Sequence, residues 1–364
     1  MKEIKAAVLR APKSPFSIES VKLDAPRDDE VLVELVATGI CHTDVAIVDQ
    51  IMPLPPPLVL GHEGAGIVRE VGKGVTSVAV GDHVVLGFAS CGHCRECAAG
   101  HPAYCDSMAA LNFGGRRSDG SPVIHDAKDQ PLNASFFGQS SFATHSTVRA
   151  RDVVKVRKDI PLKFLGPLGC GFMTGAGTIL NVLKPDRDAN IAIFGAGAVG
   201  FAALFAARSL GCKRIMMVDR VKSRLDLARE LGATEVVNTA DANLDQALAA
   251  FGGLNFGMDT TGVPVVVEAA IRALKIRGTL ALIGASSQSK FSGDIMHMIS
   301  GRSIIGAVEG DSVPATFIPF LAEKFAKGEF PIDRLTADYP FGQINQAVAD
   351  GTSGKTIKPI LLFE

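Results

Sequence analysis

Apolar segments of strand length alternate with helical segments from residue 190 onward, and this alternation limits the fold more than any other feature. Strands and helices are expected, in order, at 190–194, 199–210, 214–218, 223–231, 236–238, 254–259, 265–274 and 279–283. Such an order is typical of a parallel sheet whose faces are covered by helices. We therefore predict an α/β fold with a doubly wound parallel sheet in this part of the chain.

A glycine motif joins the first of these strands to its helix, and it reads Gly195-Ala-Gly197-Ala-Val199-Gly200. The first glycine permits a tight turn, the second lets the backbone approach a pyrophosphate, and the third lets helix and strand pack closely. The N-terminus of the helix then faces the phosphates. The motif predicts a dinucleotide site, although a glycine-rich turn can also join a strand to a helix without binding a ligand.

An acidic residue, Asp219, follows the next expected strand. A carboxylate at this place accepts hydrogen bonds from the hydroxyls of the adenosine ribose and repels a 2′-phosphate. NAD is therefore the expected cofactor. Arg220 stands beside the carboxylate and leaves some tolerance of NADP open.

Four of the seven cysteines are close together in the chain, at Cys91, Cys94, Cys97 and Cys105. Two residues between successive thiols let one loop direct three sulfurs at a common point, and the fourth thiol completes a tetrahedron around Zn²⁺. A closed shell of four sulfurs has no position for a substrate, so this zinc is expected to be structural. Free buried thiols and an iron–sulfur cluster are the alternatives. In such a cluster the fourth cysteine usually comes sooner and precedes proline, whereas Asp106 follows here.

A second metal site is expected because further candidate ligands are present. Cys41 follows a strand expected at 30–39, and His62 follows a proline-rich loop. Each alone is ambiguous, but with one more thiol they form the Cys₂His set that leaves one zinc position open. The candidates for that thiol are Cys170 and Cys212. We favour Cys170, because Cys212 precedes a strand of the parallel sheet and is expected at the end opposite the cofactor.

Composition argues against several classes of partner. Lys and Arg number 37 against 38 for Asp and Glu, a net charge of −1, so nucleic-acid binding is not expected. The odd number of cysteines does not suggest a secreted disulfide framework. The first residues lack the apolar core of a signal peptide, and the uncharged run 191–207 falls just short of a membrane span. We expect a cytoplasmic protein with no membrane partner.

Taken together, the motifs resemble those of zinc-dependent medium-chain alcohol dehydrogenases over essentially the whole chain. The four-cysteine segment follows the family signature, which reads Gly61-His62-Glu63, Gly66, Gly72 and Val75. The resemblance implies a GroES-like β-rich catalytic domain made of residues 1–171 and 310–364, with a Rossmann NAD-binding domain over 172–309. Short β-like runs in the first third of the chain and an expected final strand over 356–363 agree independently with this division.

The resemblance also implies metal and acid roles. Cys41, His62 and Cys170 match the ligands of the catalytic zinc, and the four-cysteine group matches those of a structural zinc, which makes two zinc ions per chain. Glu63 matches an acid that assists ligand exchange at the catalytic metal.

Further roles concern the cofactor and the proton. His42 and Lys358 match positions that contact the cofactor pyrophosphate, and Arg224 matches one near the adenosine ribose. Thr43 matches the hydroxyl that takes the substrate proton. Relatives often have a histidine three residues later, where this chain has Ala46. Either His42 or a chain of waters must then release the proton.

The implied reaction is zinc-dependent oxidation of an alcohol to an aldehyde, with hydride transfer to NAD. The segments 168–175 and 308–314 most resemble aryl-alcohol (benzyl alcohol) dehydrogenases, which act on benzylic and sometimes allylic primary alcohols. Glutathione-dependent formaldehyde dehydrogenase and a general alcohol dehydrogenase are alternatives within the family. A non-catalytic redox sensor that binds zinc and a nucleotide is the alternative from another class. Relatives pair through the Rossmann sheet edge, so the run 301–308 is expected to support a homodimer or homotetramer.

Overall fold

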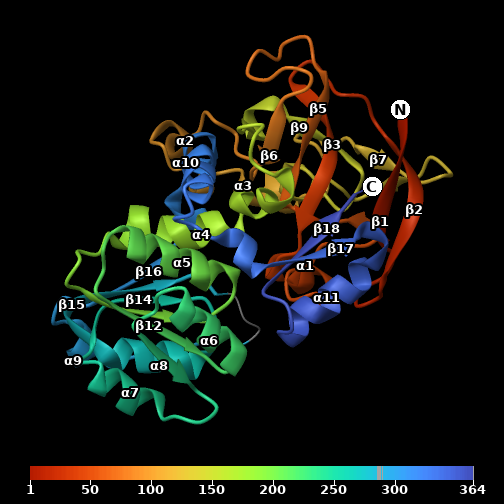
Figure 1. The fold of residues 1–364 in the computed structure, drawn as a ribbon. Coiled ribbons are helices and arrows are strands. Elements are labelled where there is room, and N and C mark those ends of the chain that lie inside the picture. Colours follow the sequence, from red (N-terminus) through yellow and green to blue (C-terminus); the bar gives the residue numbers. More distant parts are fainter. Residues whose placement is uncertain (285–287, 289, 364) are drawn as a thin grey trace. The chain divides into compact units, whose positions relative to one another are not determined.

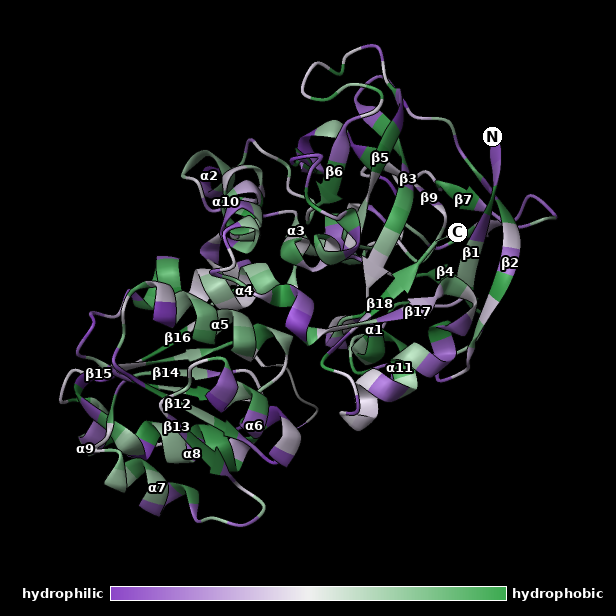
Figure 2. Cartoon of the chain, viewed as in Figure 1, coloured by the Kyte–Doolittle hydropathy of each residue, from purple (hydrophilic) through white to green (hydrophobic). Residues whose placement is uncertain are grey.

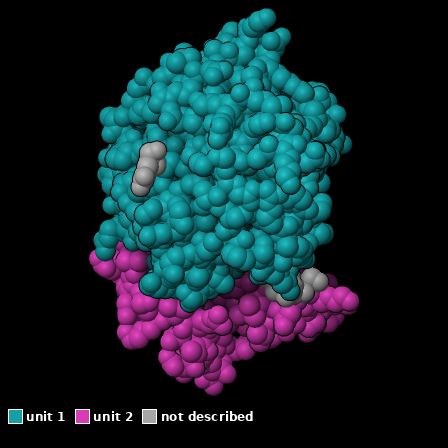
Figure 3. Space-filling view, turned by 90° about the vertical axis from the view of Figure 1, so that its right-hand side faces the viewer, with its two compact units in different colours: residues 1–170, 313–364 teal, residues 171–312 magenta. Residues whose placement is uncertain are grey.

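The structure, a computed structural model, describes residues 1–284, 288 and 290–363. The chain forms two compact units. Unit 1 consists of Met1–Cys170 and Val313–Glu364, and unit 2 consists of Gly171–Ser312; they are coloured teal and magenta in Figure 3. The limits of the proposed domains, after residues 171 and 309, are close to these unit limits.

Unit 1 is built on two sheets of mainly antiparallel strands, with the orders β4-β1-β2-β7-β8 and β10-β6-β5-β3-β18-β17, and β9 pairs with β3 as well. The strands are β1 (Lys2–Leu9), β2 (Phe16–Leu23), β3 (Glu30–Gly39), β4 (Leu58–Val59), β5 (Gly64–Val71), β6 (His83–Leu86), β7 (Ile124–His125), β8 (Pro131–Leu132), β9 (His145–Arg149), β10 (Val153–Lys155), β17 (Thr336–Pro340) and β18 (Lys358–Leu362). The helices are α1 (His42–Val48), α2 (Arg95–Ala98), α3 (Met108–Phe113), α10 (Pro314–Ala326) and α11 (Ile344–Ser353).

Both ends of the chain contribute to the second of these sheets. Strand β18 pairs antiparallel with β3 and parallel with β17, and Figure 1 shows the blue β18 beside the red β3. Four of the five residues of β18 are buried, which explains why its sequence is mainly apolar. The segments that flank unit 2 in the sequence therefore form one structure, as the GroES-like fold requires.

Unit 2 contains one parallel sheet with the order β13-β12-β11-β14-β15-β16. The strands are β11 (Asn190–Phe194), β12 (Arg214–Asp219), β13 (Glu235–Asn238), β14 (Leu254–Asp259), β15 (Leu274–Leu282) and β16 (Ser303–Gly306). The helices are α4 (Gly171–Gly177), α5 (Ala198–Ser209), α6 (Lys222–Glu230), α7 (Leu244–Ala250), α8 (Pro264–Ala273) and α9 (Ile295–Met298). The strand order reverses between β11 and β14, which is the doubly wound Rossmann arrangement. The predicted fold class is confirmed.

The sheet of unit 2 is apolar along its strands because helices cover both of its faces. Figure 1 shows α5 on one face and α8 on the other. All five residues of β11 are buried, and Figure 2 shows β12 in green, whereas α6 carries much purple on its exposed turns. Within the described part of the chain, no helix has both the length and the apolar character needed to cross a membrane.

Candidate active site and metal centres

The three residues predicted to bind the catalytic metal lie together in unit 1. Cys41 directly precedes α1, His62 lies between β4 and β5, and Cys170 ends the first of the two segments of unit 1. Their ligand atoms and a carboxylate oxygen of Glu63 all lie within 4.8 Å of one another. The Sγ atoms of Cys41 and Cys170 are 3.9 Å apart. A disulfide needs about 2.05 Å, whereas two sulfurs on a tetrahedral zinc with bonds of about 2.3 Å lie about 3.8 Å apart. The spacing therefore fits a shared metal.

The imidazole of His62 is oriented for a metal. Its ring is buried, and its Nδ1 lies 3.1 Å from Oδ1 of Asp44. When Nδ1 donates its proton to this carboxylate, Nε2 keeps a free lone pair. Nε2 has no hydrogen-bond partner among the described residues. A buried nitrogen of this kind is costly unless it binds something, and a zinc ion between it and the two thiols would satisfy it.

Asp44 is a functional residue that the sequence analysis missed. Its carboxylate accepts hydrogen bonds from the backbone amides of Cys41, at 3.0 Å, and Gly61, at 3.1 Å, and it also holds His62. It therefore ties two predicted ligands into one arrangement. The available signal was its place three residues after Cys41 at the start of a helix, the spacing of a capping box.

The charges of these groups shift one another's pKa values. A hydrogen bond from Cys170 holds the pKa of the Cys41 thiol well below its ordinary value, although burial opposes this. Burial alone would lower the pKa of His62, but the nearby charges of Asp44 and Cys41 raise it well above its ordinary value. These directions reflect how close the thiols, the imidazole and the carboxylate lie to one another. Metal ligands bind deprotonated, so a metal ion would take the place of a proton here.

Glu63 pairs with Lys358 beside this cluster. Both carboxylate oxygens of Glu63 lie 2.8 Å from Nζ of Lys358, which also donates to the carbonyl oxygen of Ile40 at 3.1 Å. Burial raises the pKa of Glu63, although Lys358 opposes the shift. Burial would lower the pKa of Lys358, but Glu63 and Cys41 raise it. Because both side chains are almost fully buried, the structure places Lys358 against Glu63, and its predicted contact with a pyrophosphate stays a prediction.

Two predicted residues occupy the first turn of α1. The hydroxyl of Thr43 lies 3.7 Å from Sγ of Cys41, so it adjoins the candidate metal position. His42 is exposed on the same turn, and Ala46 follows one turn later. A hydroxyl beside a candidate metal ligand and an imidazole on the preceding residue are groups that can carry a proton.

The four-cysteine group forms a second candidate metal centre. The Sγ atoms of Cys91, Cys94, Cys97 and Cys105 lie within 4.8 Å of one another, and Sγ of Cys91 is 3.9 Å from Sγ of Cys97. The backbone amide of Cys94 donates to Cys91, and that of Cys97 donates to Cys94. Backbone hydrogen bonds from His93 and Cys94 lower the pKa of Cys91 to about 6, against the effect of burial. Burial raises the pKa of Cys97 to about 12. A closed four-sulfur shell of this geometry fits zinc.

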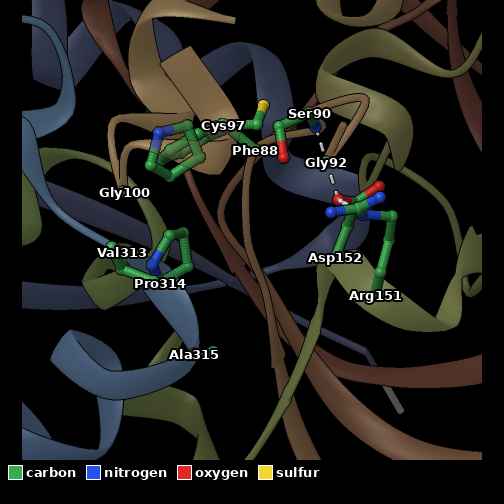
Figure 4. A pocket seen from close by; sticks show the side chains of 11 residues that line it. Phe88, Ser90, Gly92, Cys97, Gly100, Arg151, Asp152, Val313, Pro314 and Ala315 are labelled. Carbon is green, nitrogen blue, oxygen red and sulfur yellow. Dashed lines mark hydrogen bonds and ion pairs between the residues drawn. The ribbon is translucent and has the colours of Figure 1, made fainter. Parts of the chain in front are cut away.

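Arg151 and Asp152 attach this cysteine segment to the rest of unit 1. Arg151 donates to the carbonyl oxygen of Cys91 at 2.6 Å, and a Cβ on Gly92 would lie 1.7 Å from its guanidinium. Asp152 accepts from the backbone amide of Ser90 at 3.4 Å. Figure 4 shows these side chains on one side of a cavity of about 190 Å³. Glycine at residue 92 is therefore needed for the close approach of Arg151.

The glycine motif predicted to bind the dinucleotide lies in unit 2, where β11 meets α5. Gly195 has a φ of +101°, and a Cβ on Gly200 would lie 1.9 Å from the carbonyl oxygen of Gly195. A Cβ on Gly197 would meet nothing within 4 Å. The space beside Gly197 thus fits a pyrophosphate at the N-terminus of α5, where Val199 lies in the first turn.

Asp219 lies against this turn. Its carboxylate accepts from the backbone amides of Ala196 at 2.6 Å, Arg220 at 2.7 Å and Val221 at 2.8 Å. Arg224 follows on α6, and burial lowers its pKa, although Asp219 opposes the shift. The structure therefore brings the predicted ribose residue and the glycine motif together. Cys212, the rejected zinc ligand, lies in the same unit with its thiol 3.6 Å from the carbonyl oxygen of Asp186.

Asp44→Asn is expected to weaken metal binding by roughly 10- to 100-fold, since it removes the charge that orients His62. A chelator titration followed by metal analysis measures the change. Asp82→Asn is the control, because Asp82 is another buried carboxylate of unit 1 and pairs with Lys155 at 2.9 Å. Equal metal retention in the two variants would contradict the role of Asp44.

Comparison with known proteins identifies the family. The alcohol dehydrogenase GroES-like domain matches residues 27–158, and the zinc-binding dehydrogenase family matches residues 198–325. The chain is 42% identical to geraniol dehydrogenase of Castellaniella defragrans, over 98% of this chain and 97% of that protein. It is 34% identical to alcohol dehydrogenase 1 of Pisum sativum, over 99% of this chain and 97% of that protein. The crystal structure of benzyl alcohol dehydrogenase from Acinetobacter calcoaceticus matches all of both chains, with a TM-score of 0.96 and 43% identity. This chain belongs to the zinc-dependent medium-chain alcohol dehydrogenases.

Proposed function

We propose that the chain oxidises primary aryl or allylic alcohols to aldehydes and uses NAD as the hydride acceptor. The observation that carries the proposal is the buried Nε2 of His62, which lies without a protein partner among the described residues beside the thiols of Cys41 and Cys170. Three protein ligands leave the fourth position of a tetrahedral zinc open, as catalytic sites require. In this proposal the four-cysteine group holds the second, structural zinc.

The chain's own groups are proposed to move the proton. A zinc ion held by Cys41, His62 and Cys170 would supply a Lewis acid for an alcohol oxygen. Thr43 adjoins this position through Cys41 and would take the proton of the alcohol. Ala46 offers no base, so we assign the next step to the exposed His42. Glu63, held by Lys358, would assist the exchange of substrate and water.

The geometry of unit 2 supports a proposal for which residues bind the cofactor. Gly195, Gly197, Val199 and Gly200 would hold the pyrophosphate, and bound NAD would supply the hydride acceptor. Asp219 would bind the ribose hydroxyls, with Arg224 nearby. The contact of His42 and Lys358 with the pyrophosphate stays a prediction from the resemblance, and Lys358 is buried against Glu63.

Asp219→Asn is expected to raise the preference for NADP over NAD by at least roughly tenfold, because it removes the charge that repels a 2′-phosphate, and a charge-assisted hydrogen bond is worth about 1.5–3 kcal/mol. The measurement is kcat/KM for each cofactor. Asp226→Asn is the control, since Asp226 is an exposed acid of α6 that pairs with Lys222. An unchanged cofactor ratio in the Asp219 variant would count against the ribose contact.

An aromatic cluster next to His62 supports the substrate class. The rings of Phe136 and Phe137 contact that of His62, and Phe113 packs against both with centroids 5.8 and 5.2 Å away. These rings make the surroundings of His62 apolar, which suits an aryl or allylic alcohol better than a charged substrate. Two similar proteins, a geraniol dehydrogenase and a benzyl alcohol dehydrogenase, are named for alcohols whose hydroxyl-bearing carbon adjoins a π-system.

The test is the absorbance of NADH formed with benzyl alcohol, geraniol, ethanol or S-hydroxymethylglutathione. We expect kcat/KM for the first two to exceed that for ethanol by at least roughly tenfold, which is about 1.4 kcal/mol of extra transition-state binding. If S-hydroxymethylglutathione or ethanol is turned over fastest, the proposed aryl or allylic substrate class is wrong, and glutathione-dependent formaldehyde dehydrogenase or a general alcohol dehydrogenase takes its place. No turnover of any of them by protein with two bound zinc ions would favour the non-catalytic sensor.

Self-association is proposed through unit 2. Strand β16 ends the sheet order of the described strands, and an edge strand offers unpaired backbone groups to a second copy. Ile295, Met296 and Ile299 on and beside α9 are more than two-thirds exposed. We propose a homodimer, with a homotetramer as the alternative, and light scattering distinguishes them.

We also propose a cytoplasmic location. The seven cysteines are an odd number, six of them are proposed to bind zinc, and such a set is more typical of a reducing compartment than of a secreted disulfide framework. Fractionation of the native host measures the location directly.

A further inference from the structure

Two adjacent phenylalanines pack on the ring of His62. The ring of Phe137 stacks on the imidazole with a centroid distance of 4.4 Å and an interplanar angle of 22°. The ring of Phe136 meets the same imidazole edge-on at 5.3 Å and 87°. The hydrogen bond from Nδ1 to Asp44 fixes one atom of the imidazole but still allows the ring to rock about that bond. The two aromatic contacts restrict this remaining motion.

An unusual backbone makes this packing possible. Adjacent side chains of an extended strand point to opposite faces, yet Phe136 and Phe137 reach one ring. Phe137 has φ 51° and ψ 33°, in the left-handed region, and Ser135, Gly138 and Ser140 have φ values of 59°, 71° and 52°. A bulky residue in this region is strained, and such strain persists only where the surroundings enforce it.

Hydrogen bonds join the same segment to the backbone around His62. Nε2 of Gln139 donates to the carbonyl oxygen of His62 at 3.0 Å, and its Oε1 accepts from the amide of Gly64 at 3.1 Å. The hydroxyl of Ser140 accepts from the amide of Phe136 at 3.0 Å and donates to the carbonyl oxygen of Val59 at 2.7 Å. The segment therefore contacts the ring of His62 through Phe136 and Phe137, and it bonds to the main chain of His62 through Gln139.

We propose that residues 135–141 form a clamp that positions His62 for the catalytic metal, with Phe137 as the positioning residue for the imidazole. The inference rests on the proposed function, because it takes His62 to be a zinc ligand. The strained backbone is retained because it presents both aromatic rings to this ligand. Groups that orient a metal-bound histidine change metal affinity by roughly 10- to 100-fold.

The test is the rate at which zinc leaves the fully loaded protein in excess chelator, followed with a metal-sensitive dye. Phe137→Leu keeps an apolar side chain but loses the stacking. We expect one of the two zinc ions to leave roughly tenfold faster, while the second leaves at the parent rate. Phe137→Tyr retains the ring and should restore slow release. In protein whose zinc is replaced by Co²⁺, the visible absorption bands of the metal at one site should shift in Phe137→Leu. They should not shift in Phe137→Tyr.

Phe16→Leu is the matched control, because Phe16 is 6% exposed against 5% for Phe137 and pairs with Phe142 at 5.8 Å rather than with His62. Release from Phe137→Leu at the rate of this control would overturn the inference while the proposed function stands. Gln139→Met provides the same comparison if Phe137→Leu does not fold. A parent protein that binds no zinc at Cys41, His62 and Cys170 would overturn both the inference and the proposed function.

Discussion

Cys170→Ala is expected to lose one of two bound zinc ions and to lower kcat/KM by roughly 10³-fold or more. The reason is that Lewis-acid stabilisation by a catalytic metal is worth several kcal/mol, and each 1.36 kcal/mol changes a rate tenfold. The Sγ of Cys170 lies 3.9 Å from that of Cys41. Without Cys170, only Cys41 and His62 of the three proposed ligands would remain. Metal analysis and NADH absorbance measure the two effects on the same sample.

Cys212→Ala is the control for this prediction. Cys212 is also a buried thiol, but it lies in unit 2 and bonds to the carbonyl oxygen of Asp186. Its removal should leave the zinc content and the turnover close to those of the parent. Retention of both zinc ions by Cys170→Ala would contradict the assignment of the catalytic ligands.

Lys358→Met is expected to destabilise unit 1 by about 3–5 kcal/mol, because it leaves the buried charge of Glu63 without its partner. Both side chains are at most 3% exposed, and both carboxylate oxygens bond to Nζ. The measurement is the free energy of unfolding in urea. Adding Glu63→Gln removes the unpaired charge, so the double variant should recover part of the loss.

Lys355→Met serves as the control for the buried pair. Lys355 pairs with Asp350 at 2.9 Å, close to the 2.8 Å between Lys358 and Glu63, but its side chain is 71% exposed. Exposed pairs contribute about 0–1 kcal/mol. A loss in Lys358→Met no larger than in Lys355→Met would show that Glu63 does not depend on Lys358.

The parallel sheet could be predicted because its strands carry a strong local signal. Strands β11 and β14 begin and end at the expected residues, since strands covered on both faces are continuously apolar. The short helix α1 was missed because only Asp44 and Ile47 of its seven residues are buried, which leaves little apolar periodicity. Helices α7 and α11 were missed as well, and the hairpin of β1 and β2 was not assigned.

The candidate site was predictable where residue type and spacing carry the chemistry. Cys41, His62 and Cys170 could be selected because thiols and imidazoles are the ligands that zinc prefers. The contacts that orient them depend on tertiary structure. Lys358 bonds to Glu63 across 295 residues of chain, and Phe137 reaches His62 only because its backbone is left-handed. A single sequence contains no local signal for either contact.

Anomalous X-ray scattering at the zinc absorption edge, from crystals of the purified chain, tests the central claim most directly. Our account predicts two peaks in each chain. One should lie among Cys41, His62 and Cys170, and the other should lie among the four cysteines from Cys91 to Cys105. A peak among the four cysteines alone, with none beside Nε2 of His62, would contradict the account of an open catalytic zinc site.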